Sequence, residues 1–301
     1  MKLTWRRLVL VVGSLLIVLL ALSAAMAGGG AVPLTEAPPD AMDTIQRTLS
    51  WSSAGAHTLE LSNVTGALRV TGYDGPTVEM TANRTIRASS DAALEAARTK
   101  ARVEATESAD TIRVCGNREH CGCSDGSWHD GRSSRDSGYH VTVDFDIRVP
   151  RNTVLKLCTV NDGNVTVDGV AGDFDASNVN GGILLTAMSG SGRATTVNGP
   201  VHAAFASAPR AASTFKTVNG DIEVRLPPDV SADLSLKTVN GGLYTDFDVT
   251  SLAPAALVRD RHGKLSSGRL DRFASVRAGQ GGPELRLEGV NGNVRVLRND
   301  K

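Results

Sequence analysis

The residues best suited to chemistry in this sequence gather in one polar, Gly- and Ser-rich stretch. They are Cys115, His120, Cys121, Cys123 and His129. Thiolate and imidazole groups are the usual ligands of tetrahedral zinc, so the set is large enough for a metal site. The spacing fits zinc poorly, because the Cys-x-Cys at Cys121 and Cys123 has no second clean cysteine pair beside it. The sequence therefore favours no metal here and leaves zinc as an alternative.

Disulfide bonds are the competing chemistry for the same thiols. Cys158 brings the total to four cysteines, which allow two bridges in three connectivities. The chain begins with a basic and then apolar segment typical of export signals, and an exported protein meets an oxidising compartment in which disulfides form and persist. We expect disulfides among Cys115, Cys121, Cys123 and Cys158, with one bridge from Cys158 to the polar stretch and one within it.

Catalytic residues are not indicated. Glycan-cleaving enzymes need grouped carboxylates for proton transfer, and the candidate carboxylates are spread among turns and outward positions with no shared face. The sequence also lacks a Walker-type phosphate loop and His-Glu-x-x-His. We expect no enzyme activity and no cofactor, and keep a carbohydrate-active enzyme as the alternative. The carboxylates considered are Asp173, Asp175, Asp221, Asp233 and Asp246.

A repeated Val-Asn-Gly phrase organises the rest of the chain. Its Asn recurs at steps of 19, 18, 21, 21 and 51 residues, and steps near 20 are the length of one coil of a solenoid. We expect the phrase to form the corner of each coil. The corner residues are Asn161, Asn180, Gly181, Asn198, Gly199, Asn219, Gly220, Asn240, Gly241, Asn291 and Gly292.

Aligning the coils on Asn predicts which columns are buried. The positions four before and three after Asn are apolar, and the position three before it, which includes Cys158, is mostly polar. We expect the Val immediately before Asn to fill the core, the Asn amide to tie neighbouring coils together, and Gly to take a positive φ at the turn. The alternative for the Asn column is a sugar-binding groove.

Strand and helix patterns outside the phrase predict an all-β fold with one helix. Alternation begins at Thr58 and is clearest from Val141 to Pro150, and Val64-Thr65-Gly66 is expected to be a divergent first coil. The stretch from Ser89 to Ala101 is rich in helix formers and begins with capping residues. The predicted fold is a single β-solenoid with one short helix near its N-terminal end.

The N-terminal residues form a targeting signal. Lys2, Arg6 and Arg7 precede an apolar run, and Ala25-Met26-Ala27 offers a small-x-small cleavage site. We expect residues 1–27 to be a signal peptide, or else an uncleaved anchor, followed by a linker at 28–45. The β-solenoid domain then covers 46–301, with loop insertions at about 116–138 and 247–283, the last copy of the phrase closing the array.

Together these patterns resemble a bacterial family of exported putative adhesins, domains of unknown function with a β-strand repeat. The resemblance rests on Leu68–Asp74, Ile147–Pro150, the Val-Asn-Gly phrases and Gly281–Leu285, and covers roughly Thr58 to the C-terminus. It implies an exported β-solenoid and assigns no catalytic residue.

The expected function is therefore that of a non-enzymatic β-solenoid of the periplasm, cell envelope or extracellular space, binding an unknown protein or glycan. A carbohydrate-active enzyme and a structural or stress-response envelope component are the alternatives. Equal numbers of basic and acidic residues, 32 each, leave no net field for nucleic acid. Membrane contact is expected only through an uncleaved N-terminal segment.

Overall fold

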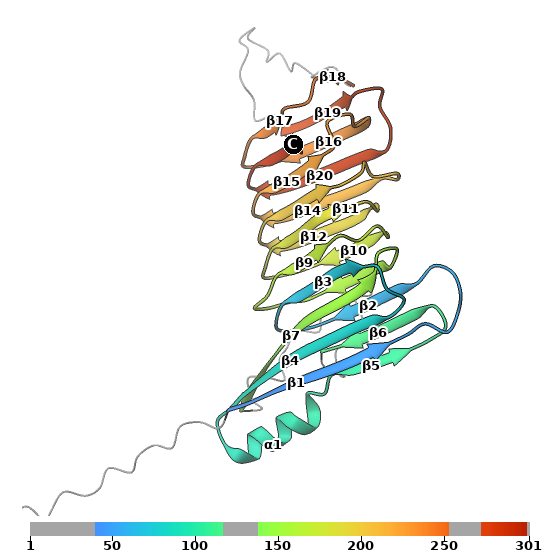
Figure 1. The fold of residues 1–301 in the computed structure, drawn as a ribbon. Coiled ribbons are helices and arrows are strands. Elements are labelled where there is room, and N and C mark those ends of the chain that lie inside the picture. The colour runs from blue at the N-terminus through green and yellow to red at the C-terminus, as the bar shows by residue number, and fades with distance from the viewer. Residues whose placement is uncertain (1–39, 117–137, 253–271, 300–301) are drawn as a thin grey trace, which may run out of the picture. The chain divides into compact units, whose positions relative to one another are not determined.

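The computed structural model describes residues 40–116, 138–252 and 272–299. The chain divides into two units, residues 1–37 and 38–301, and all described residues belong to the second. They form two large mixed sheets that do not close, together with one short helix (Figure 1). The predicted all-β class with one short helix is confirmed.

The first sheet contains ten strands and carries the N-terminal strand at one edge. In spatial order these are β1 (Asp40–Leu49), β4 (Val78–Ala88), β7 (Tyr139–Pro150), β3 (Leu68–Tyr73), β9 (Val165–Asp168), β11 (Ile183–Met188), β13 (Val201–Phe205), β15 (Ile222–Leu226), β21 (Val294–Arg298) and β17 (Leu243–Thr245).

The second sheet contains eleven strands. In spatial order these are β18 (Val249–Ser251), β19 (Arg272–Ala278), β16 (Ala232–Thr238), β20 (Glu284–Asn291), β14 (Ser213–Asn219), β12 (Gly192–Asn198), β10 (Phe174–Ser177), β8 (Val154–Cys158), β2 (Thr58–Ser62), β6 (Thr111–Cys115) and β5 (Glu104–Glu107).

Successive turns of the chain contribute one strand to each sheet, and equivalent strands pair in parallel. In the first sheet Ile183 pairs with Val165 on one side and Val201 on the other. The phrase positions stay in register, because Asn180 bridges to Asn198 across neighbouring turns. Thr65 bridges to Asn161 in the same way, which confirms that Val64-Thr65-Gly66 belongs to a divergent copy.

The last copy of the phrase does not close the array, which corrects our expectation. β20 pairs with β14 on one side and β16 on the other, and β21 likewise lies between β15 and β17. The far edge of β16 is occupied by the antiparallel β19, so β20 takes the remaining edge. The physical reason is that the 51-residue step leaves enough chain to return on the other side of β16.

The two predicted insertions differ in how much of them is described. The range 247–283 is not only a loop, because it contains β18 and β19, which continue the second sheet. Its charged run, residues 259–264, lies outside the described residues, as do residues 117–137 of the first insertion. His120, Cys121, Cys123 and His129 are therefore not placed.

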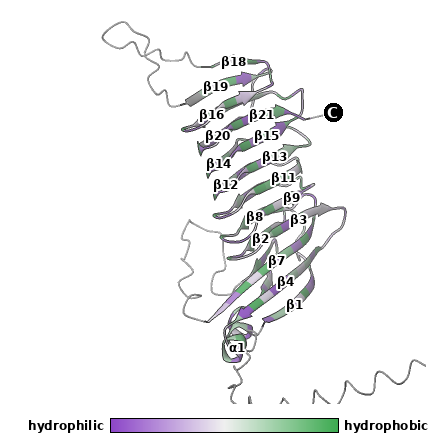
Figure 2. Cartoon of the chain, turned by 90° about the vertical axis from the view of Figure 1, so that its left-hand side faces the viewer, coloured by the Kyte–Doolittle hydropathy of each residue, from purple (hydrophilic) through white to green (hydrophobic). Residues whose placement is uncertain are grey.

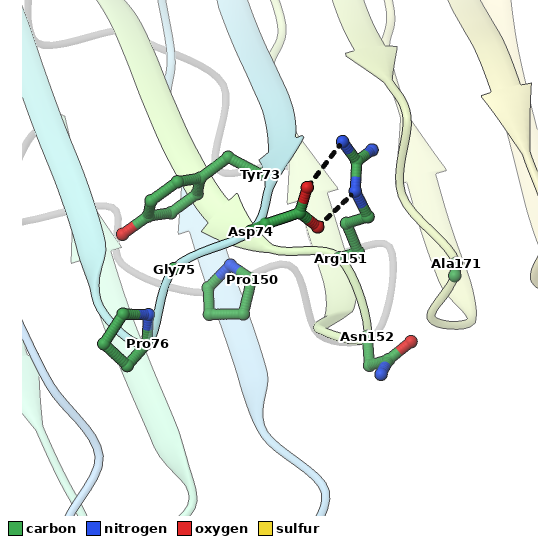
Figure 3. A pocket seen from close by; sticks show the side chains of 8 residues that line it. All are labelled: Tyr73, Asp74, Gly75, Pro76, Pro150, Arg151, Asn152 and Ala171. Atoms are coloured by element: carbon green, nitrogen blue, oxygen red, sulfur yellow. Dashed lines mark hydrogen bonds and ion pairs between the residues drawn. The ribbon is translucent and has the colours of Figure 1, made fainter.

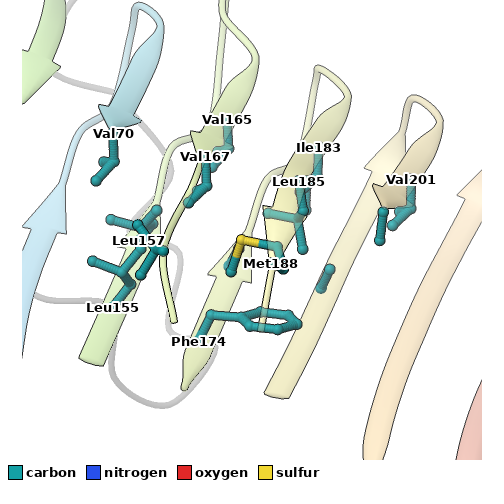
Figure 4. Close-up of a cluster of buried hydrophobic side chains, with 14 of the residues drawn as sticks. Val70, Leu155, Leu157, Val165, Val167, Phe174, Ile183, Leu185, Met188 and Val201 are labelled. Carbon is teal, nitrogen blue, oxygen red and sulfur yellow. The ribbon is translucent and has the colours of Figure 1, made fainter. Parts of the chain in front are cut away.

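The core lies between the inner faces of the two sheets. Figure 4 shows Leu155 and Leu157 alongside Val165 and Val167, and all four are almost completely buried. Figure 2 shows apolar and polar residues interleaved along the strands, as the two-residue period of a strand requires. Each such buried side chain contributes about 1.5–3 kcal/mol to stability. A single turn buries too few of them to be stable alone, so the turns must stack.

The valine of the phrase faces outward, which corrects the prediction that it fills the core. Val197 and Val218 are each 39% exposed, whereas the preceding Thr196 and Thr217 are 1% and 2% exposed. Successive strand residues point to opposite faces. Because the position four before Asn is buried, the position two before it must also point inward and the Val must point outward.

The buried threonines explain why a polar residue is tolerated inside. Thr217 Oγ1 donates to Gly199 O at 2.8 Å, and Thr238 Oγ1 donates to Gly292 O at 2.8 Å. In the turn that has Asn178 at this position, its Nδ2 donates to Gly163 O at 2.9 Å. These contacts satisfy corner carbonyls that the strand ladder leaves free.

The matched substitutions Thr217→Val and Val218→Thr test this orientation. We expect Thr217→Val to cost about 1–3 kcal/mol, because it leaves a partly buried carbonyl without its donor. Val218→Thr should change stability by no more than about 0.5 kcal/mol, since the side chain stays at the surface. Urea denaturation of both variants measures the two losses of stability. A larger loss for Val218→Thr than for Thr217→Val would indicate that the valine, and not the threonine, is buried.

The helix caps the extended N-terminal strands. α1 (Asp91–Lys100) begins after Ser90, whose side-chain oxygen accepts from Ala93 N, so the predicted helix is confirmed. Leu94 and Ala97 pack with Ile86 and other residues of β4 and β7 in a small second core. Within the described part of the chain, no helix has the length and apolar character needed to cross a bilayer.

The ordered fold begins earlier than expected. β1 starts at Asp40 and pairs over ten positions with β4, so the range 28–45 is not linker throughout. The sequence signal was weak because β1 has only one buried residue, Leu49. Residues 1–27 lie outside the described residues.

Candidate functional site

The predicted corner asparagines lie next to one another along one edge of the stacked turns. Asn180 Nδ2 donates to Asn161 Oδ1 at 2.8 Å, and the same contact at 2.8 Å links each following amide to the one before it. Their spatial order is Asn161, Asn180, Asn198, Asn219, Asn291 and Asn240. Each interior amide donates to one neighbour and accepts from the other, which orients the whole row.

A second set of side chains, two or three residues after the corner Asn, accepts hydrogen bonds from the backbone of the neighbouring turn. Asp221 Oδ1 accepts from Asn293 N at 2.8 Å, and Asn293 Oδ1 accepts from Gly242 N at 3.0 Å. Asn164 Oδ1 accepts from Gly182 N at 2.8 Å. Polar side chains therefore bind backbone groups of the next turn beside each corner.

The corner glycines are required mainly by close approach between turns. A Cβ added to Gly220 would overlap Gly199 O, and one added to Gly181 would overlap Gly163 O. A positive φ, which we expected at every corner, occurs at Gly220 (+154°) but not at Gly181 or Gly241. A positive φ therefore explains the need for glycine at some corners only. The close approach between turns explains it at Gly181 and Gly241 as well as at Gly220.

The outward valines form an apolar stripe beside the asparagine row. Val197, Val218, Val290 and Val239 are 37–46% exposed and lie on or directly after β12, β14, β20 and β16, which are consecutive strands of the second sheet. At a strand spacing of about 4.7–4.9 Å the four side chains extend over roughly 15 Å. We call the six valines and the six asparagines of the phrase together the Val–Asn edge. Its members are Val160, Asn161, Val179, Asn180, Val197, Asn198, Val218, Asn219, Val239, Asn240, Val290 and Asn291.

Charged side chains on the outer face border the Val–Asn edge. Lys216 Nζ lies 2.7 Å from Glu288 Oε2, and Arg286 Nε also contacts the Glu288 carboxylate. The hydrogen bond from Lys216 is the largest cause that lowers the pKa of Glu288 below its usual value. Two cations therefore share one carboxylate on the outer face beside the apolar stripe.

The five candidate carboxylates are not brought together. Asp221 binds Asn293 N and Arg295, and Asp233 receives two hydrogen bonds from Arg277 at 2.7 and 2.9 Å. Asp173 accepts from Ser191 N at 2.9 Å. A general acid needs a raised pKa, whereas hydrogen bonds to backbone Asn293 and to Arg277 lower the pKa values of Asp221 and Asp233 respectively. These carboxylates hold turns and strands together.

The contacts of Asp221 predict an acid-dependent loss of stability. Because its pKa is lowered in the folded state, its contribution is present above the unfolded value of about 3.9 and is lost as pH falls through the folded pKa. We expect Asp221→Asn to be less stable than the wild type at neutral pH and the difference to shrink on acidification. Chemical denaturation at several pH values measures it. Asp175→Asn, at an exposed position, is the control, and a difference that does not vary with pH would contradict the assignment.

An open hollow of about 610 Å³ lies at the loops that follow β3, β7 and β9 (Figure 3). Asp74 and Arg151 pair across it, with Arg151 Nε 2.8 Å from Asp74 Oδ1. This hydrogen bond lowers the pKa of Asp74. The guanidinium of Arg148 lies 4.5 Å from the centre of the Tyr73 ring. The charged groups of this hollow are thus directed at each other, which makes it a weaker ligand site than the Val–Asn edge.

The two described cysteines lie close together without being direct neighbours. Cys115 and Cys158 both pair with Ser62, from opposite sides of β2. They are thus two strand spacings apart, about 9.5 Å, which exceeds the Cα separation of about 6.8 Å that a disulfide tolerates. Neither is a free thiol. Cys158 is 3% exposed, although we expected its column to face water.

We predict that Cys115 and Cys158 each pair with one of Cys121 and Cys123. Alkylation of the denatured, unreduced wild type should find no free thiol. Cys158→Ser should then release one thiol, which mass spectrometry should locate at Cys121 or Cys123. A label on Cys115 in this variant, or four thiols in the wild type, would contradict the pairing. Within the described ranges no group of three His, Cys, Asp or Glu residues could hold a metal.

Comparisons with known proteins find only distant similarity. No protein-family model matches the chain, and no curated protein matches its sequence. A crystal structure of a putative cell adhesion protein from Clostridium sporogenes covers 85% of this chain and 100% of its own, with a TM-score of 0.43 and 9% identity. A putative adhesin from Bacteroides fragilis covers 85% and 97%, with a TM-score of 0.32 and 11% identity. Both are too distant to assign this chain a family or an activity.

Proposed function

We propose that this protein is an exported, non-enzymatic binding scaffold of the cell envelope or extracellular space, of the putative-adhesin type. The observation that carries the proposal is the Val–Asn edge, where consecutive turns present the same apolar and amide side chains outward. A row of identical weak sites suits a repetitive protein or glycan surface, because linked contacts add in avidity.

The proposed architecture is a single β-solenoid with antiparallel strands at both ends. Its support is the in-register parallel pairing of equivalent strands, from β3 and β9 to β21 and β17. At one end β4 pairs antiparallel with β1 and β7, and at the other β19 pairs antiparallel with β16 and β18. Such terminal strands cover the open ends that a stack of coils would otherwise expose.

The proposal includes two further points: the protein is exported, and it has no catalytic activity. Support for a non-enzymatic role comes from the carboxylates, which are used in contacts between turns. Support for export comes from the basic and apolar N-terminal residues and their small-x-small site. We propose no nucleic-acid partner, no cofactor, and membrane contact only through an uncleaved N-terminal segment.

Adhesion by cells that produce and export the protein tests the proposal. We expect the double variant Val197→Glu/Val218→Glu to reduce retention on a protein- or glycan-coated surface to the level of cells lacking the protein. Each substitution places a charge in the apolar stripe, and the new side chain points away from the core, so the fold is preserved.

Leu184→Glu is the matched control, because Leu184 is a 45% exposed apolar residue on the other sheet. It should leave retention unchanged. Equal retention by the double variant and the wild type would refute the role of the Val–Asn edge. Release of new reducing ends from polysaccharides by the purified protein would refute the non-enzymatic assignment and favour the carbohydrate-active alternative.

A further inference from the structure

β1 is a long edge strand with one side unpaired. It pairs with β4 from Asp40↔Arg87 to Leu49↔Val78 without a register shift, and it ends the order of the first sheet (Figure 1). No strand among residues 40–116, 138–252 and 272–299 pairs with its other edge. Native proteins protect such edges with proline, charged side chains, bulges or short length. β1 carries charges at Asp43 and Arg47 but has no proline, lysine or bulge, and it is ten residues long. Its free backbone groups are therefore available to another strand.

The side chains of β1 add an apolar group to this edge. Ile45 and Leu49 face the core side, whereas Met42 is 81% exposed on the outer side together with Thr44 and Gln46. Met42 is the most exposed of the large apolar residues in the described part of the chain. Methionine and arginine are enriched where protein surfaces meet.

We propose that β1 pairs antiparallel with β1 of a second copy of this chain, about a two-fold axis through Ile45. An axis perpendicular to the sheet reverses the strand and keeps the core faces of both copies on the same side. In this register Asp43 faces the partner's Arg47, and the symmetry creates the same pair twice. A shift of the axis by one residue would place Asp43 opposite the partner's Ile45 or the partner's Leu49, so charge complementarity selects the register.

Both charged groups can take part. Arg47 is exposed and forms no ion pair with residues of the described ranges. Asp43 receives a hydrogen bond from Arg84 Nε at 3.0 Å, yet its side chain is 47% exposed. A carboxylate has about four lone-pair sites and can therefore accept from a second guanidinium.

The same register gives the exposed methionine a place to bind. Met42 faces the partner's Thr48, which borders a surface hollow of about 320 Å³. Methionine is flexible enough to fill irregular spaces of this kind. The hollow is lined by Gln46, Arg47, Thr48, Glu79, Met80 and Thr81.

The molar mass of the protein expressed from the full chain tests the proposal. Light scattering over a concentration series should show a monomer–dimer equilibrium, and amide exchange in residues 40–49 should slow as the dimer forms. Arg47→Glu should weaken the dimer about tenfold or more, because the introduced carboxylate would face the partner's Asp43. Met42→Glu should also weaken it.

Arg69→Glu is the matched control, because Arg69 is an exposed arginine on the interior strand β3 of the same sheet. It should leave the dissociation constant unchanged, and circular dichroism should show that all three variants are folded. A monomer at every concentration would overturn the proposal, as would a dimer insensitive to both β1 variants or one whose slowed amides lie outside β1.

Discussion

Gly220→Val is expected to destabilise the protein by about 4 kcal/mol or more, at the upper end of single substitutions. The added Cβ would overlap the carbonyl of Gly199 in the turn on one side, while Gly220 N donates to Asn291 O of the turn on the other side at 2.9 Å. The φ of +154° adds strain for a β-branched residue. Relief requires the turns to separate, which breaks the asparagine row on both sides.

Lys216→Val, four residues earlier on β14, is the control for this substitution. Lys216 points outward and forms an ion pair with Glu288, and such exposed pairs contribute about 0–1 kcal/mol. The loss of stability caused by Lys216→Val should therefore be small. Urea denaturation of both variants gives the comparison, and equal losses would contradict the assignment of Gly220 to a contact between turns and Lys216 to the outer face.

Ending the chain after Gly282 is expected to abolish the cooperative fold. The truncation removes β20 and β21, which lie inside the sheets, and it leaves β14 and β16 without a shared neighbour. It also removes four almost completely buried residues, Leu285, Leu287, Val294 and Val296. At about 1.5–3 kcal/mol each, their loss is comparable with the whole stability of a domain, about 5–15 kcal/mol.

Thermal unfolding followed by circular dichroism, with limited proteolysis, measures this effect. The control ends at Asn299 and keeps the contacts of Asn299 with Phe205 O and Leu226 O, so it should unfold like the full chain. A truncated protein that retained the wild-type transition would show that the last copy only closes the array, as the sequence order had led us to expect.

The phrase itself shows where sequence reasoning failed. The columns three and four residues before Asn had already set the alternation, and following it for two more residues places Thr inside and Val outside. Residue polarity predicts the opposite arrangement, since valine is usually buried and threonine usually exposed. The threonine is tolerated because its hydroxyl binds a corner carbonyl, as at Thr217 and Gly199.

The candidate site was therefore predicted in part. The asparagines and glycines of the corners could be found from their repetition, and Asn180 and Asn198 show the contact that an amide can make across neighbouring turns. The apolar half of the Val–Asn edge could not be found while Val218 was assigned to the core. Nor could the spacing of the cysteines reveal that Cys115 and Cys158 lie on either side of β2.

The sequence by itself determined the all-β class, the length of each turn, the helix at Asp91–Lys100 and the place of each corner. These features depend on local patterns: the two-residue alternation, the capping residues and the period of the phrase. The tertiary structure alone decided that β20 lies between β14 and β16 and that β1 ends the first sheet. The physical reason is that strand pairing joins residues far apart in the chain, and parallel edges with similar side chains accept one another in more than one order.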